Sequence, residues 1–189
     1  SAASDVYKRQ GLTYNLGAHV IDQAVQLFGM PEAVFADIAT LRTGGKVDDY
    51  FIIHLMKPAR MPEVKITLKA SYLMCENEPR FVLHGTEGSY VKYGLDPQEA
   101  DLTKGMLPDT PHWGEEDESQ WGILHTETDG NVVRKPYPTL PGNYAAFYEN
   151  IYQHIRNGAV LQSDACGVLG VIRLIEAAWE SSRTGNVIK

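Results

Sequence analysis

The segment VKITLKA, residues 64–70, alternates apolar and polar side chains without a break. A period of two places the aliphatic side chains on one side of a β-strand and the lysines and threonine on the other. A strand of this kind covers a hydrophobic core with one face and leaves its second face to solvent or to a partner. The segment therefore predicts an antiparallel sheet that is buried on one side.

The flanking sequence continues with short strand patterns separated by turns. Strands are predicted at 34–41, 50–56, 80–84 and 89–93, with weaker ones at 122–126 and 131–135. Glycine pairs in TGGK, residues 43–46, and in GTEG, residues 85–88, are typical of hairpin turns. Because strands joined by short turns pair antiparallel, the pattern predicts one large, mostly antiparallel sheet.

Helices are predicted towards both ends of the chain. Apolar residues recur at helical spacing from Leu16 to Phe28, from Tyr144 to Ile155, and again from about 165 up to Gly185. Asn143 is the expected N-cap of the second helix, and Ser163 or Asp164 that of the third. Strands between terminal helices predict an α+β fold, with helices packed on one face of the sheet.

The chain is expected to form a single domain over residues 11–189. The first ten residues, SAASDVYKRQ, are small, polar and aperiodic, and the character of the sequence changes sharply at Gly11. We therefore expect residues 1–10 to be a non-native leader and exclude them from the fold.

Composition narrows the range of partners. The net charge is −7, from 24 acidic and 17 basic residues, which argues against nucleic acid and against an anionic membrane surface. No apolar run approaches the ~18 residues of a membrane span, so the cytoplasm is the expected location. Cys75 and Cys166 form no C-x-x-C motif and are expected to be buried thiols. The six histidines lack the spacing of a metal site, so no metal is expected.

The stretch YNLGAHVID, residues 14–22, places polar, proton-handling groups at the start of the first helix. With Asn15 as N-cap, His19 and Asp22 follow on the same helix face, at spacings that allow side chains to meet. An imidazole beside a carboxylate is a natural general base near neutral pH. The structural alternative is that Asn15 caps, His19 packs and Asp22 favours the helix dipole. Spacing alone favours this alternative.

The segment GLTYNLGAHVIDQA, residues 11–24, resembles the start of the C-terminal domain of the Gfo/Idh/MocA oxidoreductases, whose usual motif is G-G-G-x-L-x-D-x-G-x-H-x-x-D. The resemblance extends over residues 11–189 and is closest to the scyllo-inositol dehydrogenase-like branch. It includes HGTEGSY at 84–90, GLDPQE at 94–99, PGNY at 141–144 and IEAA at 175–178.

This resemblance implies roles for the three polar residues. His19 would be the base that takes the proton of a substrate hydroxyl while hydride passes to nicotinamide. The aspartate four residues before the motif histidine helps to hold the substrate, and here that position is Asn15. An amide cannot take up the proton but can still bind a sugar hydroxyl. Asp22 would also line the substrate site.

The sequence departs from the complete family pattern because it has no strand followed by G-x-G-x-x-G, and no counterpart of the E-K-P lysine. We therefore predict the C-terminal substrate-binding and oligomerisation domain of an NAD(P)-dependent sugar or polyol dehydrogenase, without a Rossmann domain. NAD or NADP would serve the full-length enzyme, and this chain alone would bind neither and be inactive. A homo-oligomer is expected through the open sheet face. The alternative is a non-catalytic, stand-alone ligand-binding or self-association module.

Overall fold

A computed structural model describes residues 11–189, apart from the side chain of Thr128. The predicted leader lies outside the described residues. The chain divides into two compact units, one formed by the residues up to Cys75 together with Ser163–Lys189, the other by Glu76–Gln162. The single domain expected for residues 11–189 stays a prediction.

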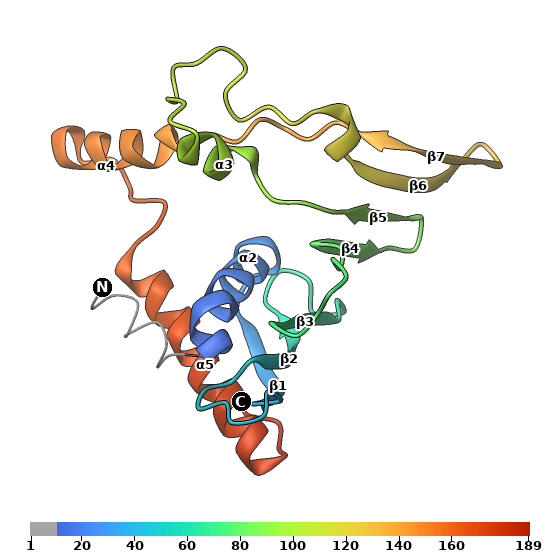
Figure 1. The fold of residues 1–189 in the computed structure, drawn as a ribbon, viewed down its shortest axis with the longest axis vertical. Coiled ribbons are helices and arrows are strands. Elements are labelled where there is room, and N and C mark those ends of the chain that lie inside the picture. The colour runs from blue at the N-terminus through green and yellow to red at the C-terminus, as the bar shows by residue number, and fades with distance from the viewer. Residues whose placement is uncertain (1–10) are drawn as a thin grey trace. The chain divides into compact units, whose positions relative to one another are not determined.

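The first unit is a three-stranded sheet covered by helices (Figure 1). Strands β1 (Pro31–Ala39), β2 (Tyr50–Pro58) and β3 (Ile66–Ser71) pair antiparallel in sequence order. A π-helical turn, η1 (Thr13–Gly17), leads directly into α2 (Ala18–Phe28), and α5 (Ala165–Thr184) closes the chain. Helix α5 packs on β1 and on α2, which places both helices on the same face of the sheet.

The core of this unit lies between that face and the helices, as the alternating pattern predicts. In β3 Ile66 is buried, while its polar neighbours Lys65 and Thr67 are exposed. The same side of the sheet contributes Phe51 and Ile53, both fully buried. The remaining buried apolar residues come from all parts of the unit: Leu12, Ile21, Ala24, Val34, Ala36, Leu55, Val171, Leu174, Ile175 and Ala178.

Two serines of α5 satisfy the backbone of β1, which has β2 on one side only. The Ala36 N–H donates to Ser181 Oγ at 3.0 Å, and the Ile38 N–H donates to Ser182 Oγ at 2.9 Å. Ile188 forms an isolated antiparallel bridge with Val34 further along the same edge. These contacts use N–H groups that an edge strand would otherwise leave unpaired.

The second unit contains a four-stranded antiparallel sheet in the order β4 (Phe81–His84), β5 (Gly88–Lys92), β6 (Gly122–Thr128) and β7 (Asn131–Tyr137). It also contains α3 (Pro97–Thr103), the short 3₁₀ helix η2 (Glu118–Gln120) and α4 (Ala145–Asn157). Asn143 was expected to be the N-cap of α4, but the N-cap position is Tyr144; the Asn143 side chain still accepts from the Ala146 N–H in the first turn, at 3.1 Å.

A buried amide links three segments of the second unit. Gln98 is fully buried, and its Oε1 accepts from Trp113 Nε1 and from the Tyr144 N–H, both at 2.8 Å. Its Nε2 donates to the Asp96 carboxylate at 3.0 Å. The polar sequence 94–99 therefore has a structural role, holding the loop around Trp113 and the start of α4 together.

The α+β class, the antiparallel pairing and all seven predicted strands are confirmed. The seven strands form ladders of three and four in the described residues, where the sequence pattern led us to expect one large sheet. Helix α3 was not predicted, although Asp96 caps it and Pro97 occupies its first position. The prediction that Cys75 and Cys166 are buried is wrong, because both lie outside the cores and are exposed.

Removing the Ser181 hydroxyl should destabilise the fold. Ser181→Ala leaves the buried Ala36 N–H without its acceptor, and we expect a loss of about 1–3 kcal/mol in the free energy of unfolding. Ser163→Ala is the control, since Ser163 is exposed and just outside α5. Urea denaturation measures both variants, and equal midpoints would contradict this role.

Candidate functional site

The helix that carries the predicted site residues is anchored by Asp48. The Asp48 carboxylate accepts from the Thr13 N–H at 2.6 Å and from Thr13 Oγ1 at 2.7 Å, and the Asp48 carbonyl accepts from the Leu12 N–H at 2.9 Å. Asp48 is 4% exposed and Thr13 fully buried. Charge-assisted hydrogen bonds of this kind offset the cost of burying a carboxylate.

The anchor requires a glycine at position 11. Gly11 has a φ of +68°, in the left-handed region that favours glycine. A Cβ atom there would lie 1.6 Å from Asp48 Oδ1, far inside van der Waals contact. Glycine is therefore required at the start of segment 11–24, because the Asp48 carboxylate occupies the space of a side chain.

Asn15 does not cap a helix, and the prediction that it does is wrong. The chain is already helical before Asn15, and Asn15 lies inside the π-helical turn η1. Asp48 binds the preceding backbone N–H groups, so the Asn15 side chain is released from capping. π-Helical turns are rare and occur often at functional sites, where they redirect side chains.

The side chain of Asn15 instead bonds to Tyr72. Asn15 Nδ2 donates to Tyr72 Oη at 3.1 Å, and the two residues lie 57 positions apart in the sequence. Tyr72 follows the last residue of β3, and its N–H donates to the Asp49 carbonyl at 3.0 Å. Tyr72 was not recognised in the sequence, where it is one of ten tyrosines in an unremarkable strand end.

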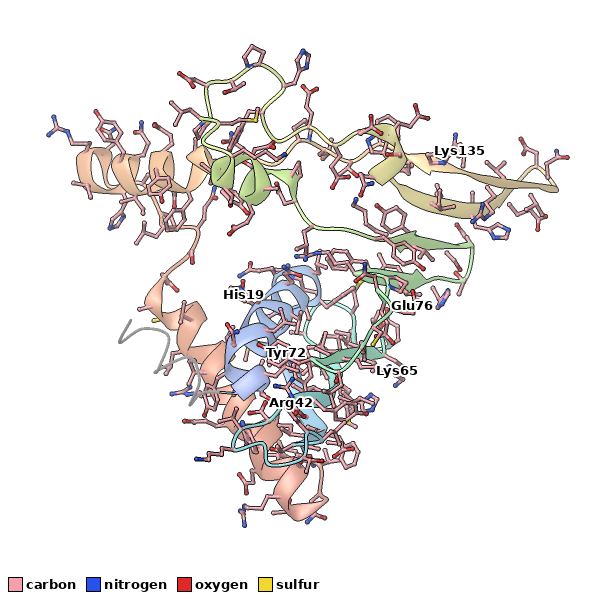
Figure 2. The ribbon with its side chains drawn as sticks, viewed as in Figure 1. His19, Arg42, Lys65, Tyr72, Glu76 and Lys135 are labelled. Atoms are coloured by element: carbon pink, nitrogen blue, oxygen red, sulfur yellow. The ribbon has the colours of Figure 1, made fainter. Side chains whose placement is uncertain are left out.

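His19 and Asp22 lie on α2, within the two turns that follow Asn15, and both are exposed (Figure 2 labels His19 and Tyr72). Within residues 11–189, neither a hydrogen bond nor an ion pair joins His19 to Asp22. Asp22 Oδ1 instead accepts from Gln26 Nε2 at 3.5 Å, the long limit of a hydrogen bond. The structure thus leaves the imidazole accessible to a ligand. It brings together Asn15 and Tyr72, but does not show Asp22 orienting His19.

A separate open hollow of about 410 Å³ lies in the second unit, around the β4–β5 hairpin. None of the predicted site residues lines it. Its walls are Leu83, Gly85, Thr86, Glu87, Gly88, Ser89, Tyr90, Leu124 and Thr126. Glu87 is the one carboxylate among these lining residues and no histidine lines the hollow, so it offers no acid–base pair, and we place the candidate site on the opening helix.

The described residues contain neither a metal-ligand cluster nor a membrane-spanning helix. Among residues 11–189, no three His, Cys, Asp or Glu side chains are grouped so that they could hold a metal ion. None of the helices described is both long and apolar enough to cross a lipid bilayer.

Residues 4–189 match the family model described as "Oxidoreductase family, C-terminal alpha/beta domain" of the Gfo/Idh/MocA proteins. The chain therefore belongs to this family and corresponds to its C-terminal domain. The resemblance noted in the opening helix is confirmed.

Individual relatives agree with this assignment. Scyllo-inositol 2-dehydrogenase (NADP(+)) IolW of Bacillus subtilis is 36% identical over 94% of this chain and 49% of its own length. An oxidoreductase structure from Bacteroides fragilis is 62% identical, with a TM-score of 0.90 over 95% of this chain and 53% of that one. The oxidoreductase yvaA of Bacillus subtilis is 36% identical, with a TM-score of 0.88 over 95% of this chain and 52% of that one. The chain thus spans about half the length of these relatives.

The Asp48 anchor can be tested by stability. Asp48→Ala leaves the buried Thr13 N–H and hydroxyl unpaired, and we expect the free energy of unfolding to fall by about 2–4 kcal/mol. Asp22→Ala is the matched control, because Asp22 is exposed, and it should change the value by less than about 0.5 kcal/mol. Urea denaturation measures the free energy of unfolding of both variants. A similar loss in the two variants would contradict the anchoring role of Asp48.

Proposed function

We propose that this chain is the substrate-binding part of an NAD(P)-dependent dehydrogenase that acts on a hydroxyl group of a sugar or polyol. The carrying observation is the exposed imidazole of His19, placed one turn after a side-chain amide that is held in position by Tyr72. The name of the Bacillus subtilis relative supports a cyclic polyol and NADP+ as the first candidates.

In the proposed reaction His19 takes the proton of the substrate hydroxyl. Its exposure lets a small polyol reach the ring nitrogen, and an imidazole has a suitable basicity near neutral pH. Asn15 offers an amide oxygen and a second N–H to substrate hydroxyls. Asp22, exposed three residues after His19, is assigned to a further hydroxyl.

The described residues supply only the substrate side of this reaction. Every strand pair among them is antiparallel, and no glycine-rich turn leads from a parallel strand into a helix. They do not fit a dinucleotide. The hydride acceptor would be held by a segment outside the described residues, and we expect this chain alone to be inactive.

The coding sequence upstream of the Gly11 codon gives a direct test. We expect an in-frame strand–G-x-G-x-x-G–helix segment and an E-K-P lysine there. An authentic start codon immediately before the Ser1 codon would overturn the dehydrogenase proposal and favour the stand-alone module.

In the protein that carries both segments, His19→Ala should lower the turnover of polyol oxidation by about 10²–10⁴-fold, the usual contribution of a general base. NAD(P)H formation measures it, with scyllo-inositol as the substrate. His154→Ala is the control, since His154 is exposed and bonds only to a backbone carbonyl in the second unit. Unchanged turnover in His19→Ala would exclude the base role.

Self-association is the second proposed function, through the outer face of the three-stranded sheet. That face presents Phe35 and His54, which stack at a centroid distance of 6.2 Å, and also Ile52 and Met56, all half-buried rather than covered. Apolar side chains at the centre of an open sheet face favour a second copy of the same face.

A charge at the centre of this face should weaken the association. Ile52 lies opposite Asp37 and Lys69, and Ile52→Lys would place an additional ammonium group in the contact. We expect sedimentation velocity to show an oligomer for the unmodified chain and a shift to monomer for the variant. Met61→Lys, in an exposed loop of the same unit, should have no effect. A monomeric unmodified chain would refute self-association.

A further inference from the structure

We propose that Tyr72 binds substrate, donating its hydroxyl proton to one oxygen of a vicinal diol while the Asn15 amide oxygen accepts from the adjacent hydroxyl. This inference rests on the proposed polyol dehydrogenase function and specifies which groups recognise the substrate. It follows from the direction of one hydrogen bond, from the fixed positions of its two partners and from the exposure of the tyrosine.

The direction of the Asn15–Tyr72 bond determines which hydrogens remain available. Asn15 Nδ2 is the donor and Tyr72 Oη the acceptor. The hydroxyl hydrogen of Tyr72 is therefore not used between the two residues, and neither is the Asn15 amide oxygen. The pair presents a donor and an acceptor side by side, the pattern that two neighbouring hydroxyl groups complement.

A carboxylate at position 15 would reverse this direction. A carboxylate only accepts, so it would take the hydroxyl hydrogen of Tyr72, which is that side chain's only donor. The amide that replaces the usual aspartate of the family thus gives Tyr72 a free donor.

Both partners are fixed by the same short segment. The Asp48 carboxylate holds Thr13, two residues before Asn15, and the Asp49 carbonyl accepts the Tyr72 N–H at 3.0 Å. The Asp49 carboxylate in turn accepts from the Leu41 and Arg42 N–H groups at 2.7 and 3.0 Å. Two consecutive aspartates therefore set the separation of the amide and the phenol, which reduces the entropy lost when a ligand binds.

Tyr72 is accessible to a ligand in spite of this anchoring. Tyr72 is 53% exposed, and Asn15 is half-buried. Because the hydroxyl of this exposed tyrosine is already oriented, its side chain loses little conformational entropy when a ligand binds. Its ring also offers an aromatic face to the C–H groups of a sugar ring.

The test measures binding of scyllo-inositol to the 189-residue chain by ¹H–¹⁵N NMR, following the backbone amide of residue 15, which every variant retains. We expect saturable shifts of that signal for the unmodified chain. Tyr72→Phe should weaken binding by about 5–10-fold, the loss of one hydrogen bond to the ligand. Tyr93→Phe is the matched control, because Tyr93 is also 53% exposed and lies in the other unit, and it should leave the affinity unchanged.

The direction of the bond is tested by repeating the substitution in the Asn15→Asp background. There the hydroxyl hydrogen is already used, so adding Tyr72→Phe should change the affinity by less than about 2-fold. An equal effect in both backgrounds would overturn the argument from bond direction.

The remaining outcomes separate this proposal from the proposed function. Saturable binding that Tyr72→Phe does not weaken would refute the role of Tyr72, and so would the absence of any shift up to tens of millimolar scyllo-inositol. Neither result affects the base role of His19, which is judged by turnover. Conversely, a His19→Ala variant with full turnover would refute the base role while leaving diol binding by the pair intact.

Discussion

The opening helix depends on one buried carboxylate. Asp48 satisfies the Thr13 N–H and hydroxyl, and it occupies the space that a side chain at position 11 would need. Because the hydrogen bonds of that turn go to Asp48, the following residues can adopt the π-helical turn in which Asn15 lies. The position of the candidate site on the sheet is thus determined by a loop residue between β1 and β2.

The adjacent residue extends the same constraint to the other side of the site. Asp49 holds the backbone of Tyr72 through its carbonyl and the loop after β1 through its carboxylate. Polar groups in the loop therefore position the site, while the apolar side chains of β2 that follow form the core beneath it. Exposed residues on this side could therefore change without altering the core.

The strands and the helices α2, α4 and α5 could be predicted from the sequence because each is determined by local pattern. Alternation in 64–70, the glycine turn at 85–88 and the cap at Asp164 each act within a few residues. The wrong assignment of Asn15 arose where a long-range contact decides. Asp48 acts on a helix 35 positions away, and nothing in the local sequence distinguishes it from a solvated acid. Asn15 has every feature of an N-cap until that contact is known.

For the candidate site too, the local pattern could be predicted from the sequence and the long-range partners could not. The family motif made Asn15, His19 and Asp22 the candidates, but a motif gives residue types and spacing and says nothing of partners supplied by another strand. The amide of Asn15 illustrates the difference. From the sequence alone, the amide looks like the loss of an acid–base group, since it can neither carry charge nor accept the substrate proton. In the structure the Asn15 amide donates a hydrogen bond to Tyr72 Oη, so the tyrosine hydroxyl hydrogen stays available. A carboxylate at position 15 would instead accept a hydrogen bond from that hydroxyl. A substitution at one position of a motif is therefore interpretable only together with the residue that it bonds to.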